Sequence, residues 1–172
     1  MPVLGGKISC RNTADAVSAL LGGVRISHYA SVTMDTVATL NDLVGGVELT
    51  VLDSFSGIDS TLVKGETVLL NGEQALKYIR SRQGMDDSTN NNRMNRQKQY
   101  LGALAEKLKG CAAEDEEFVF NAIEKINSCL VSDCSVNQLE ELAEKLTGYE
   151  TEIRILEGKS SMGEQYMEFY AD

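Results

Sequence analysis

The fold of this chain is decided by the stretch TVLLNGEQALKYIRSRQGMDDSTNNNRMNRQ, residues 67–97. It opens with a short apolar segment, and a helix is predicted to begin at Asn71 or Gly72 and to continue through Arg80. The segment from Gln83 to Asn92 is rich in Asp, Ser and Asn, which favour turns and helix caps over helix interiors. The pattern therefore predicts an apolar segment, a helix and a loop in succession.

Helices and strands alternate on both sides of this stretch. Upstream, apolar spacing predicts helices after the N-caps Asn12 and Thr13 and after Thr33, and strands over Arg25–Val32 and Val47–Val51. Glycine pairs follow both helices and should end them.

Downstream, the same spacing predicts helices over Asn92–Leu108, Glu116–Ile126 and Val136–Leu146, and a strand near Thr151–Leu156. Interleaved strands and helices favour an α/β fold, with a mixed β-sheet layered between α-helices. The 172 residues suit one domain and show no repeat, linker or second domain.

Composition and charge narrow the classes of function. Hydrophobic residues make up 42% and charged residues 24%, which is typical of a globular protein. The net charge of −10 argues against a general nucleic-acid binder, because such binding depends on neutralising phosphates. Six basic residues nevertheless lie between Lys77 and Lys98, against two acids, Asp86 and Asp87. A compact basic site on an acidic protein indicates a small anionic target.

The basic residues are arranged around the predicted loop. Arg80 and Arg82 lie where one helix ends, whereas Arg93 and Arg96 share a face at the start of the next helix, with Gln97 beside them. Guanidinium groups pair with two phosphate oxygens at a time, and a helix N-terminus attracts anions. If the loop folds back, the four arginines would converge on a phosphoryl or pyrophosphoryl group.

The alternative is a solvated face of two surface helices. Its arginines would pair with local acids such as Asp86 and Asp87. On residue counts alone this alternative is favoured, because arginine clusters are common and the spacing by itself is not a specific motif.

The cysteines and the histidine give no clear site. The four cysteines form no C-x-x-C pair, and the single histidine, His28, does not complete a zinc motif. Cys129 and Cys134 are expected to flank a short loop and could form a disulfide in an exported protein, or remain free thiols.

The whole string of residues resembles the LytR-CpsA-Psr family. The family pattern, an aromatic-x-Arg-x-Arg run followed by Asx-x-x-Arg-x-x-Arg-Gln, matches YIRSR at 78–82 and NNNRMNRQ at 90–97. Upstream, HYASVTMD at 28–35 and LNDLVGGVELTV at 40–51 are similar to the stretch that leads into the family's Gly-Gly-Val strand. The resemblance covers roughly residues 5–110 well and the remainder more weakly.

This resemblance implies a function in cell-wall biogenesis. Members are phosphotransferases that attach undecaprenyl pyrophosphate-linked glycopolymers, such as teichoic acid or capsular polysaccharide, to peptidoglycan, assisted by Mg²⁺. The implied partners are the lipid-linked glycan and the peptidoglycan acceptor, with no nucleic acid. The implied location is the extracytoplasmic face of the bacterial membrane, with the parent protein membrane-anchored. The polyprenyl tail would lie in an apolar tunnel between the sheet and the helices.

The resemblance also implies roles for individual residues. The catalytic residues would be Arg80, Arg82 and Arg93. The pyrophosphate-binding residues would be Arg80, Arg82, Arg93, Arg96, Gln97 and Asn90. Arg96 has the alternative of supporting the site structurally. Many members have Asp where this chain has Asn90, and Asn can hold an arginine or cap a helix but cannot act as a base.

Several family motifs are not found in the chain. These are a Gly-x-Asp-x-Arg stretch, an Arg-Ser-Asp that supplies magnesium carboxylates, and a Ser-x-Pro-Arg-Asp. We therefore expect a partial domain over residues 1–172, with the family core at about 5–110 and a C-terminal extension of helices and strands at 111–172. The metal ligands stay unknown and are expected in the N-terminal part that is missing. No apolar run approaches the length of a membrane helix, and no signal peptide is recognisable.

Two other functions are alternatives to the transfer of glycopolymers. A catalytically incomplete fragment or non-catalytic module could bind polyprenyl pyrophosphate without turning it over, which the missing carboxylate motifs favour. A transcriptional regulator or attenuator is the third possibility, and the acidic charge and the lack of a helix-turn-helix pattern count against it.

Overall fold

A computed structural model describes residues 6–82, 90–147, 149, 153, 158–162 and 167–171. The elements, in chain order, are α1 (Lys7–Leu20), β1 (Ala30–Val32), α2 (Asp35–Leu43), β2 (Val47–Thr50), β3 (Thr67–Leu70), α3 (Gly72–Arg80), α4 (Asn90–Glu114), α5 (Phe118–Ile126), a 3-10 turn (Asn127–Cys129), β4 (Leu130–Ser132), α6 (Val136–Thr147), β5 (Gly158–Met162) and β6 (Met167–Ala171).

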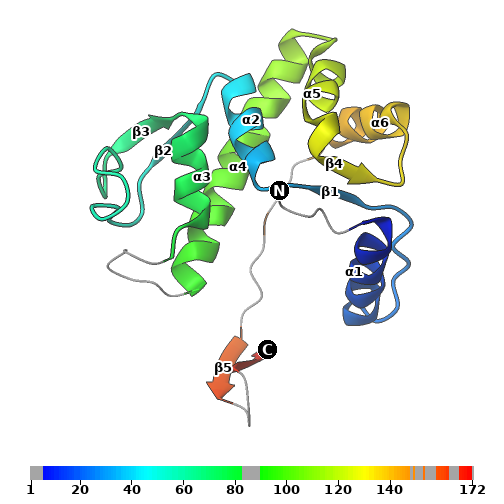
Figure 1. The fold of residues 1–172 in the computed structure, drawn as a ribbon, viewed down its shortest axis with the longest axis horizontal. Helices are drawn as coiled ribbons and strands as arrows, with labels where there is room; N and C mark the ends of the chain where they lie inside the picture. Colours follow the sequence, from blue (N-terminus) through cyan, green and yellow to red (C-terminus); the bar gives the residue numbers. More distant parts are fainter. Residues whose placement is uncertain are drawn as a thin grey trace.

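The predicted α/β class is confirmed. Helices α2, α3 and α4 form the centre, with the β2–β3 pair on one side and β1, β4, α5 and α6 on the other (Figure 1). Among the described residues the strands form three separate antiparallel pairs, β1 with β4, β2 with β3, and β5 with β6. The sheet component of the described residues is therefore a set of short two-stranded ladders.

The core lies between β2 and the helices α3 and α4. Val47 and Leu49 of β2 are buried whereas Glu48 and Thr50 are exposed, so the predicted one-sided strand is confirmed. The other buried apolar residues packed with them include Val51, Phe55, Leu62, Leu70, Ala75, Tyr78, Ile79, Tyr100 and Leu104. This core fixes the end of α3 against α4.

The start of the first helix was predicted wrongly. α1 begins after Gly6, so Asn12 and Thr13 lie inside it and do not cap it. Thr13 instead donates its hydroxyl to the carbonyl of Ser9 at 3.0 Å, a bond that lets a threonine sit in a helix interior. The predicted end is confirmed, because the two glycines at 22 and 23 adopt positive φ and close the helix.

The start of α3 is fixed by two side chains. Asn71 accepts from the backbone N–H of Gln74 at 2.9 Å while Gln74 Oε1 accepts from the N–H of Asn71 at 3.1 Å, a capping box. Asp42 Oδ1 accepts from the N–H of Gly72 at 2.7 Å, which ties α2 to α3. A Cβ at Gly72 would lie 2.7 Å from the carbonyl oxygen of Ala38, so this close approach requires glycine.

Two elements of the second half of the chain, α5 and β4, pack on the first half. α5 contacts α2 and α6, and β4, which the sequence pattern did not predict, pairs with β1. β1 is shorter than the predicted strand because pairing extends only from Ala30 to Val32. The predicted strand at 151–156 lies outside the described residues except for Ile153. No helix within the described ranges is long and apolar enough to cross a membrane.

Candidate functional site

The predicted arginine site lies where α3 ends and α4 begins. Arg80 is the last residue of α3, and Ser81 leaves the helix with an extended backbone at φ −63° and ψ 138°. Arg82 follows at once, whereas Arg93 and Arg96 lie in the first two turns of α4. The connecting residues 83–89, with the predicted acids Asp86 and Asp87, lie outside the described residues. The two helix ends lie together in Figure 1.

Arg96 is buried and connects these two helix ends through hydrogen bonds. Its side chain is 1% exposed. Its Nε donates to the carbonyl of Tyr78 at 2.9 Å, and Nη2 donates to the carbonyl of Ser81 at 2.5 Å. Nη1 forms an ion pair with Asp53, whose side chain is 14% exposed. A buried cation that meets the last carbonyls of a helix satisfies groups that the helix itself leaves without partners.

An aromatic pair also packs against the guanidinium of Arg96. Arg96 Cζ lies 5.5 Å from the centroid of the Phe55 ring, and Phe55 stacks on Tyr78 with centroids 5.4 Å apart. Of the two roles considered for Arg96, the structure favours the structural one, because its nitrogens are engaged by the protein. A guanidinium held this way positions its neighbours rather than facing a ligand.

The other predicted residues differ in exposure. Arg80 and Arg82 are exposed, and Arg93 is half-buried. Gln97 donates its side-chain amide to the carbonyl of Ile79 at 3.2 Å, so it also fastens α4 to the last turn of α3. Asn90 begins α4, and its side chain lies outside the described residues. Three arginines are thus placed at one edge of the fold, and contact with a ligand stays a prediction.

Tyr78 connects this edge to β2. Its hydroxyl donates to Gln99 Oε1 at 2.6 Å and accepts from the N–H of Leu52 at 3.2 Å. Gln99 in turn donates to the carbonyl of Thr50 at 2.9 Å. Burial raises the pKa of Tyr78 to about 12, so the phenol is neutral at physiological pH and acts as a structural donor.

Lys77 adds less positive charge to the site than its sequence position indicates. Its ammonium lies 2.8 Å from Glu73 and 3.0 Å from Asp59. The hydrogen bond that Lys77 donates to Glu73, and then the one that it donates to Asp59, raises the pKa of Lys77. The excess of positive charge at this edge therefore rests on the arginines.

An apolar cavity of about 330 Å³ lies between α2, α4, α5 and α6. Its lining includes Leu40, Leu108, Phe118, Ile123, Ile126 and Leu146, with Lys109 among the lining residues. The sequence could not name this lining, because four helices separated by up to a hundred residues contribute to it. Such a cavity suits a hydrocarbon chain.

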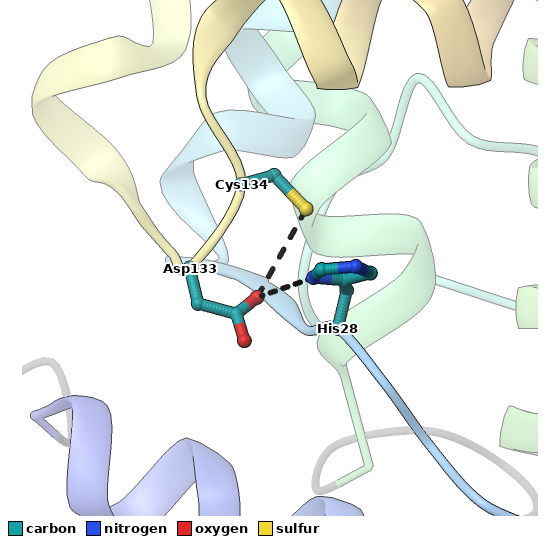
Figure 2. A group of neighbouring side chains, drawn as sticks. All are labelled: His28, Asp133 and Cys134. Carbon is teal, nitrogen blue, oxygen red and sulfur yellow. Dashed lines mark hydrogen bonds and ion pairs between the residues drawn. The ribbon is translucent and has the colours of Figure 1, made fainter.

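A second cluster was missed by sequence reasoning. Figure 2 shows His28, Asp133 and Cys134 facing one another between the segment before β1 and the turn after β4. One ligand atom from each lies within 4.8 Å of the other two. His28 and the other two residues are about a hundred positions apart, so no motif spacing could have indicated the cluster.

The disulfide considered for Cys129 and Cys134 is not formed. All four cysteines are free thiols, and the predicted short loop between these two is in fact strand β4. A strand rises about 3.3 Å per residue. The strand between the two cysteines keeps this part of the chain extended, which opposes the close approach of Cα atoms that a disulfide requires.

The described residues do not fit the expected Mg²⁺. Magnesium prefers oxygen ligands, mostly carboxylates, phosphates and water. Asp53, the carboxylate placed at the arginine helices, is committed to Arg96. The cluster in Figure 2 contains a thiol and an imidazole, which magnesium disfavours. No step is therefore assigned to a magnesium ion held by this part of the chain.

Comparison with known proteins decides the family. A model of the LytR_cpsA_psr family matches residues 4–170, nearly the whole chain. The chain belongs to the LytR-CpsA-Psr family. The resemblance inferred from the arginine pattern is thereby confirmed.

Among curated relatives, the family member from Halalkalibacterium halodurans named polyisoprenyl-teichoic acid–peptidoglycan teichoic acid transferase TagU is 35% identical over 92 residues. The match covers 54% of this chain and 30% of that protein. The matched stretch thus spans under a third of that curated family member.

Solved structures of the family share the fold. A protein from Enterococcus faecalis described as a transcriptional regulator superposes with a TM-score of 0.73 at 23% identity, covering 94% of this chain and 59% of that one. TagV of B. subtilis superposes with a TM-score of 0.68 at 24% identity, covering 98% of this chain and 65% of that one. At these identities the likeness establishes the LytR-CpsA-Psr fold.

Proposed function

We propose that this chain forms the arginine-bearing part of a phosphotransferase that attaches lipid-linked glycopolymers to peptidoglycan. The observation that carries the proposal is the pair of hydrogen bonds from the buried Arg96 to the carbonyls of Tyr78 and Ser81, which hold the end of α3 against the start of α4. Arg80 and Arg82 lie at the first of these ends and Arg93 at the second. A rigid support is what a site needs when it must hold a charged group in one position.

The proposed role of Arg80, Arg82 and Arg93 is to bind the pyrophosphate of an undecaprenyl carrier. Fork-shaped guanidinium groups pair with phosphate oxygens and neutralise the charge that develops on the leaving diphosphate. The N-terminus of α4, a helix of 25 residues, adds its own attraction for an anion. Asn90 and Gln97 are proposed to border the same group. Arg96 supports the two helix ends through its hydrogen bonds and is not proposed to contact the pyrophosphate.

The apolar cavity is the proposed site for part of the polyprenyl tail. Its lining consists of aliphatic side chains, Phe118 and Lys109, from helices that include α4 itself. Arg93 and Ala105 lie on the same helix, and a rise of 1.5 Å per residue separates them by about 18 Å. A lipid chain long enough to span that distance would connect the two sites.

The identity of the glycopolymer, the location of the parent protein and the role of Mg²⁺ are also proposed. The glycopolymer would be a teichoic acid or a capsular polysaccharide, and the parent protein would act at the extracytoplasmic face of the membrane. Mg²⁺ would be held by the substrate's phosphates and by carboxylates outside the described residues. The name of the TagU relative, which specifies a polyisoprenyl-linked donor and peptidoglycan, supports this class of partner.

The second candidate is a module that binds the lipid carrier without turning it over. The absence of a fitting magnesium site among the described residues favours it for the isolated chain. Transcriptional regulation is disfavoured, because the net charge of −10 opposes binding to nucleic acid.

Calorimetric titration with a short-chain polyprenyl pyrophosphate, with and without Mg²⁺, tests the proposal. We expect the wild-type chain to bind and the double variant Arg82→Ala with Arg93→Ala to lose at least tenfold in affinity. The matched control is Lys107→Ala with Lys125→Ala, which removes two positive charges from exposed positions elsewhere on α4 and α5. Equal binding by both double variants would refute the arginine site. Turnover of the bound lipid would separate the transferase from the binding module.

A further inference from the structure

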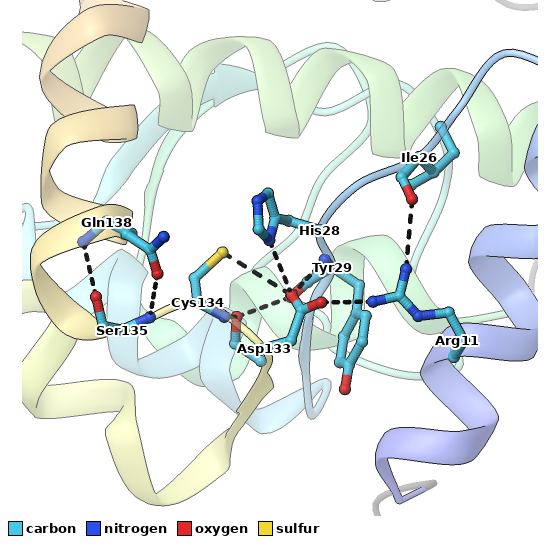
Figure 3. A network of polar contacts seen from close by, with 9 residues as sticks. Arg11, Ile26, His28, Tyr29, Asp133, Cys134, Ser135 and Gln138 are labelled. Carbon is cyan, nitrogen blue, oxygen red and sulfur yellow. Dashed lines mark hydrogen bonds and ion pairs between the residues drawn. The ribbon is translucent and has the colours of Figure 1, made fainter.

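The β1–β4 ladder brings His28 and Cys134 together. Ala30 pairs with Ser132 at the end of the ladder. The segments that continue from this pair carry His28 on one side and Asp133 and Cys134 on the other, and their ligand atoms lie within 4.8 Å of one another. Asp133, between Ser132 and Cys134, turns its carboxylate towards both His28 and Cys134 (Figure 3).

The distances suit a tetrahedral metal ion. His28 Nδ1 lies 3.5 Å from Asp133 Oδ1, and Cys134 Sγ lies 3.9 Å from the same oxygen. Zinc–ligand bonds of ordinary length at tetrahedral angles would separate nitrogen from oxygen by about 3.4 Å and sulfur from oxygen by about 3.6 Å. Small side-chain movements would therefore bring all three atoms to bonding distance of one ion.

Other residues hold the central carboxylate in place. Asp133 Oδ1 accepts from the backbone N–H of Tyr29 at 3.0 Å, and Oδ2 forms a 2.6 Å ion pair with Arg11 of α1. Arg11 also donates to the carbonyl of Ile26 at 3.4 Å. Figure 3 shows Arg11 approaching Asp133 from the side opposite Cys134, whereas the N–H of Tyr29 reaches the same oxygen that faces His28 and Cys134. A carboxylate oxygen has a second lone pair, so Oδ1 can accept from Tyr29 and still coordinate a metal.

The donor set selects the metal. A thiolate and an imidazole together with one carboxylate are ligands of zinc, whereas magnesium and calcium take oxygen ligands. The His28 side chain is 57% exposed, so the fourth position of a tetrahedron faces solvent and would hold water. The total charge of Zn²⁺, the thiolate and the carboxylate is zero, so the nearby Arg11 does not repel the complex.

We propose that His28, Asp133 and Cys134 bind Zn²⁺. The thiol of Cys134 now donates towards Asp133 Oδ1. On binding, the metal replaces this proton, which is released to the buffer, and a sulfur–zinc bond forms without any redox change. The ion joins the segment before β1 to the turn between β4 and α6, and adds to the three-residue ladder, the hydrogen bonds of Tyr29 and the Arg11 ion pair that already connect them. It thereby stabilises the junction of the two halves of the chain, and this role is independent of the proposed phosphotransfer.

Titration with Co²⁺ and competition with Zn²⁺ test the site directly. A cysteine thiolate bound to Co²⁺ produces a charge-transfer absorption band in the near ultraviolet. We expect one equivalent of Co²⁺ to bind, the band to disappear on addition of Zn²⁺, and proton release to appear in calorimetry across buffers of different ionisation enthalpy. Cys134→Ser should abolish the band, and His28→Ala should weaken binding at least tenfold.

The matched control is Cys129→Ser, which removes a half-buried thiol from the other end of β4. It should retain the band and the affinity. Circular dichroism and thermal unfolding of each metal-free variant establish that it folds. The proposal is overturned if the folded wild type gives no band, if the band survives Cys134→Ser, or if Cys129→Ser removes it. It is equally overturned if His28→Ala binds as tightly as the wild type, since a lone thiol would then explain the signal.

Discussion

The guanidinium of Arg96, on α4, donates to the backbone carbonyl of Tyr78, on α3, at 2.9 Å. This bond and the one to Ser81 occupy carbonyls at the end of α3 that a helix cannot satisfy by itself. One arginine of the motif, Arg96, is therefore part of the core. Its burial explains why an arginine, with several directed donors, is needed at this position instead of a lysine.

Replacing Arg96 should destabilise the fold strongly. Arg96→Met leaves the largely buried Asp53 carboxylate and two carbonyls without their donor, and breaking a buried ion pair costs about 3–5 kcal/mol. Urea unfolding measures the loss. The control, Arg82→Met at an exposed position, should change stability by less than about 0.5 kcal/mol. Similar unfolding midpoints for the two variants would contradict the structural role.

Alkaline pH should weaken the fold through Tyr78. Burial raises its pKa from 10.0 to about 12, so the neutral phenol stabilises the folded state fully below pH 10. That contribution is lost as the pH rises from 10 to about 12, at about 1.4 kcal/mol per pH unit. Burial also raises the pKa of Tyr100, which adds to the same trend.

Tyr78→Phe provides the measurement. Below pH 10 the variant should be less stable by about 1–3 kcal/mol, because the N–H of Leu52 and the amide of Gln99 lose their partner. The difference in unfolding free energy between the two proteins should then shrink above pH 10. A difference that stays constant up to about pH 12 would show that the phenol does not titrate as its burial requires.

Two glycine-to-alanine substitutions should change the stability of the fold in opposite directions. A Cβ at Gly72 would lie 2.7 Å from both the Ala38 carbonyl oxygen and Asp42 Oδ2, so α2 and α3 must separate, at about 1–3 kcal/mol. Gly102, inside α4, has nothing within 4 Å of such a Cβ, so alanine there should stabilise the helix by about 0.5–1 kcal/mol. Thermal unfolding of both variants tests the difference, and a stable Gly72→Ala protein would speak against the close packing.

The buried pair of Asn41 and Tyr100 should be energetically coupled. The Tyr100 hydroxyl donates to Asn41 Oδ1 at 3.2 Å, while the Asn41 amide donates to the carbonyl of Leu70 at 2.8 Å. A double-mutant cycle with Asn41→Ala and Tyr100→Phe should give an interaction energy of about 0.5–3 kcal/mol. Asn41→Ala should be the costlier single change, because it also leaves Leu70 without a donor. Additive effects would indicate that the hydrogen bond is not formed.

Much of the fold could be predicted because its signals are local. The alternation in β2, the capping residue of α3 and the glycine pair after α2 each lie within a few residues of the element that they define. The placing of Arg80 and Arg93 at adjoining helix ends followed from the same local patterns. The predicted start of α1 failed because Asn12 and Thr13 are good caps that a helix interior also tolerates.

By itself the sequence determined the α/β class, the positions of the arginines on their helices and membership of the LytR-CpsA-Psr family, since all three depend on short-range spacing. Only the tertiary structure decided that Arg96 is buried against Tyr78 and that β4 exists as the partner of β1. It also placed His28 beside Cys134. These features depend on strand register and packing between segments far apart in the chain, for which no local pattern carries a signal.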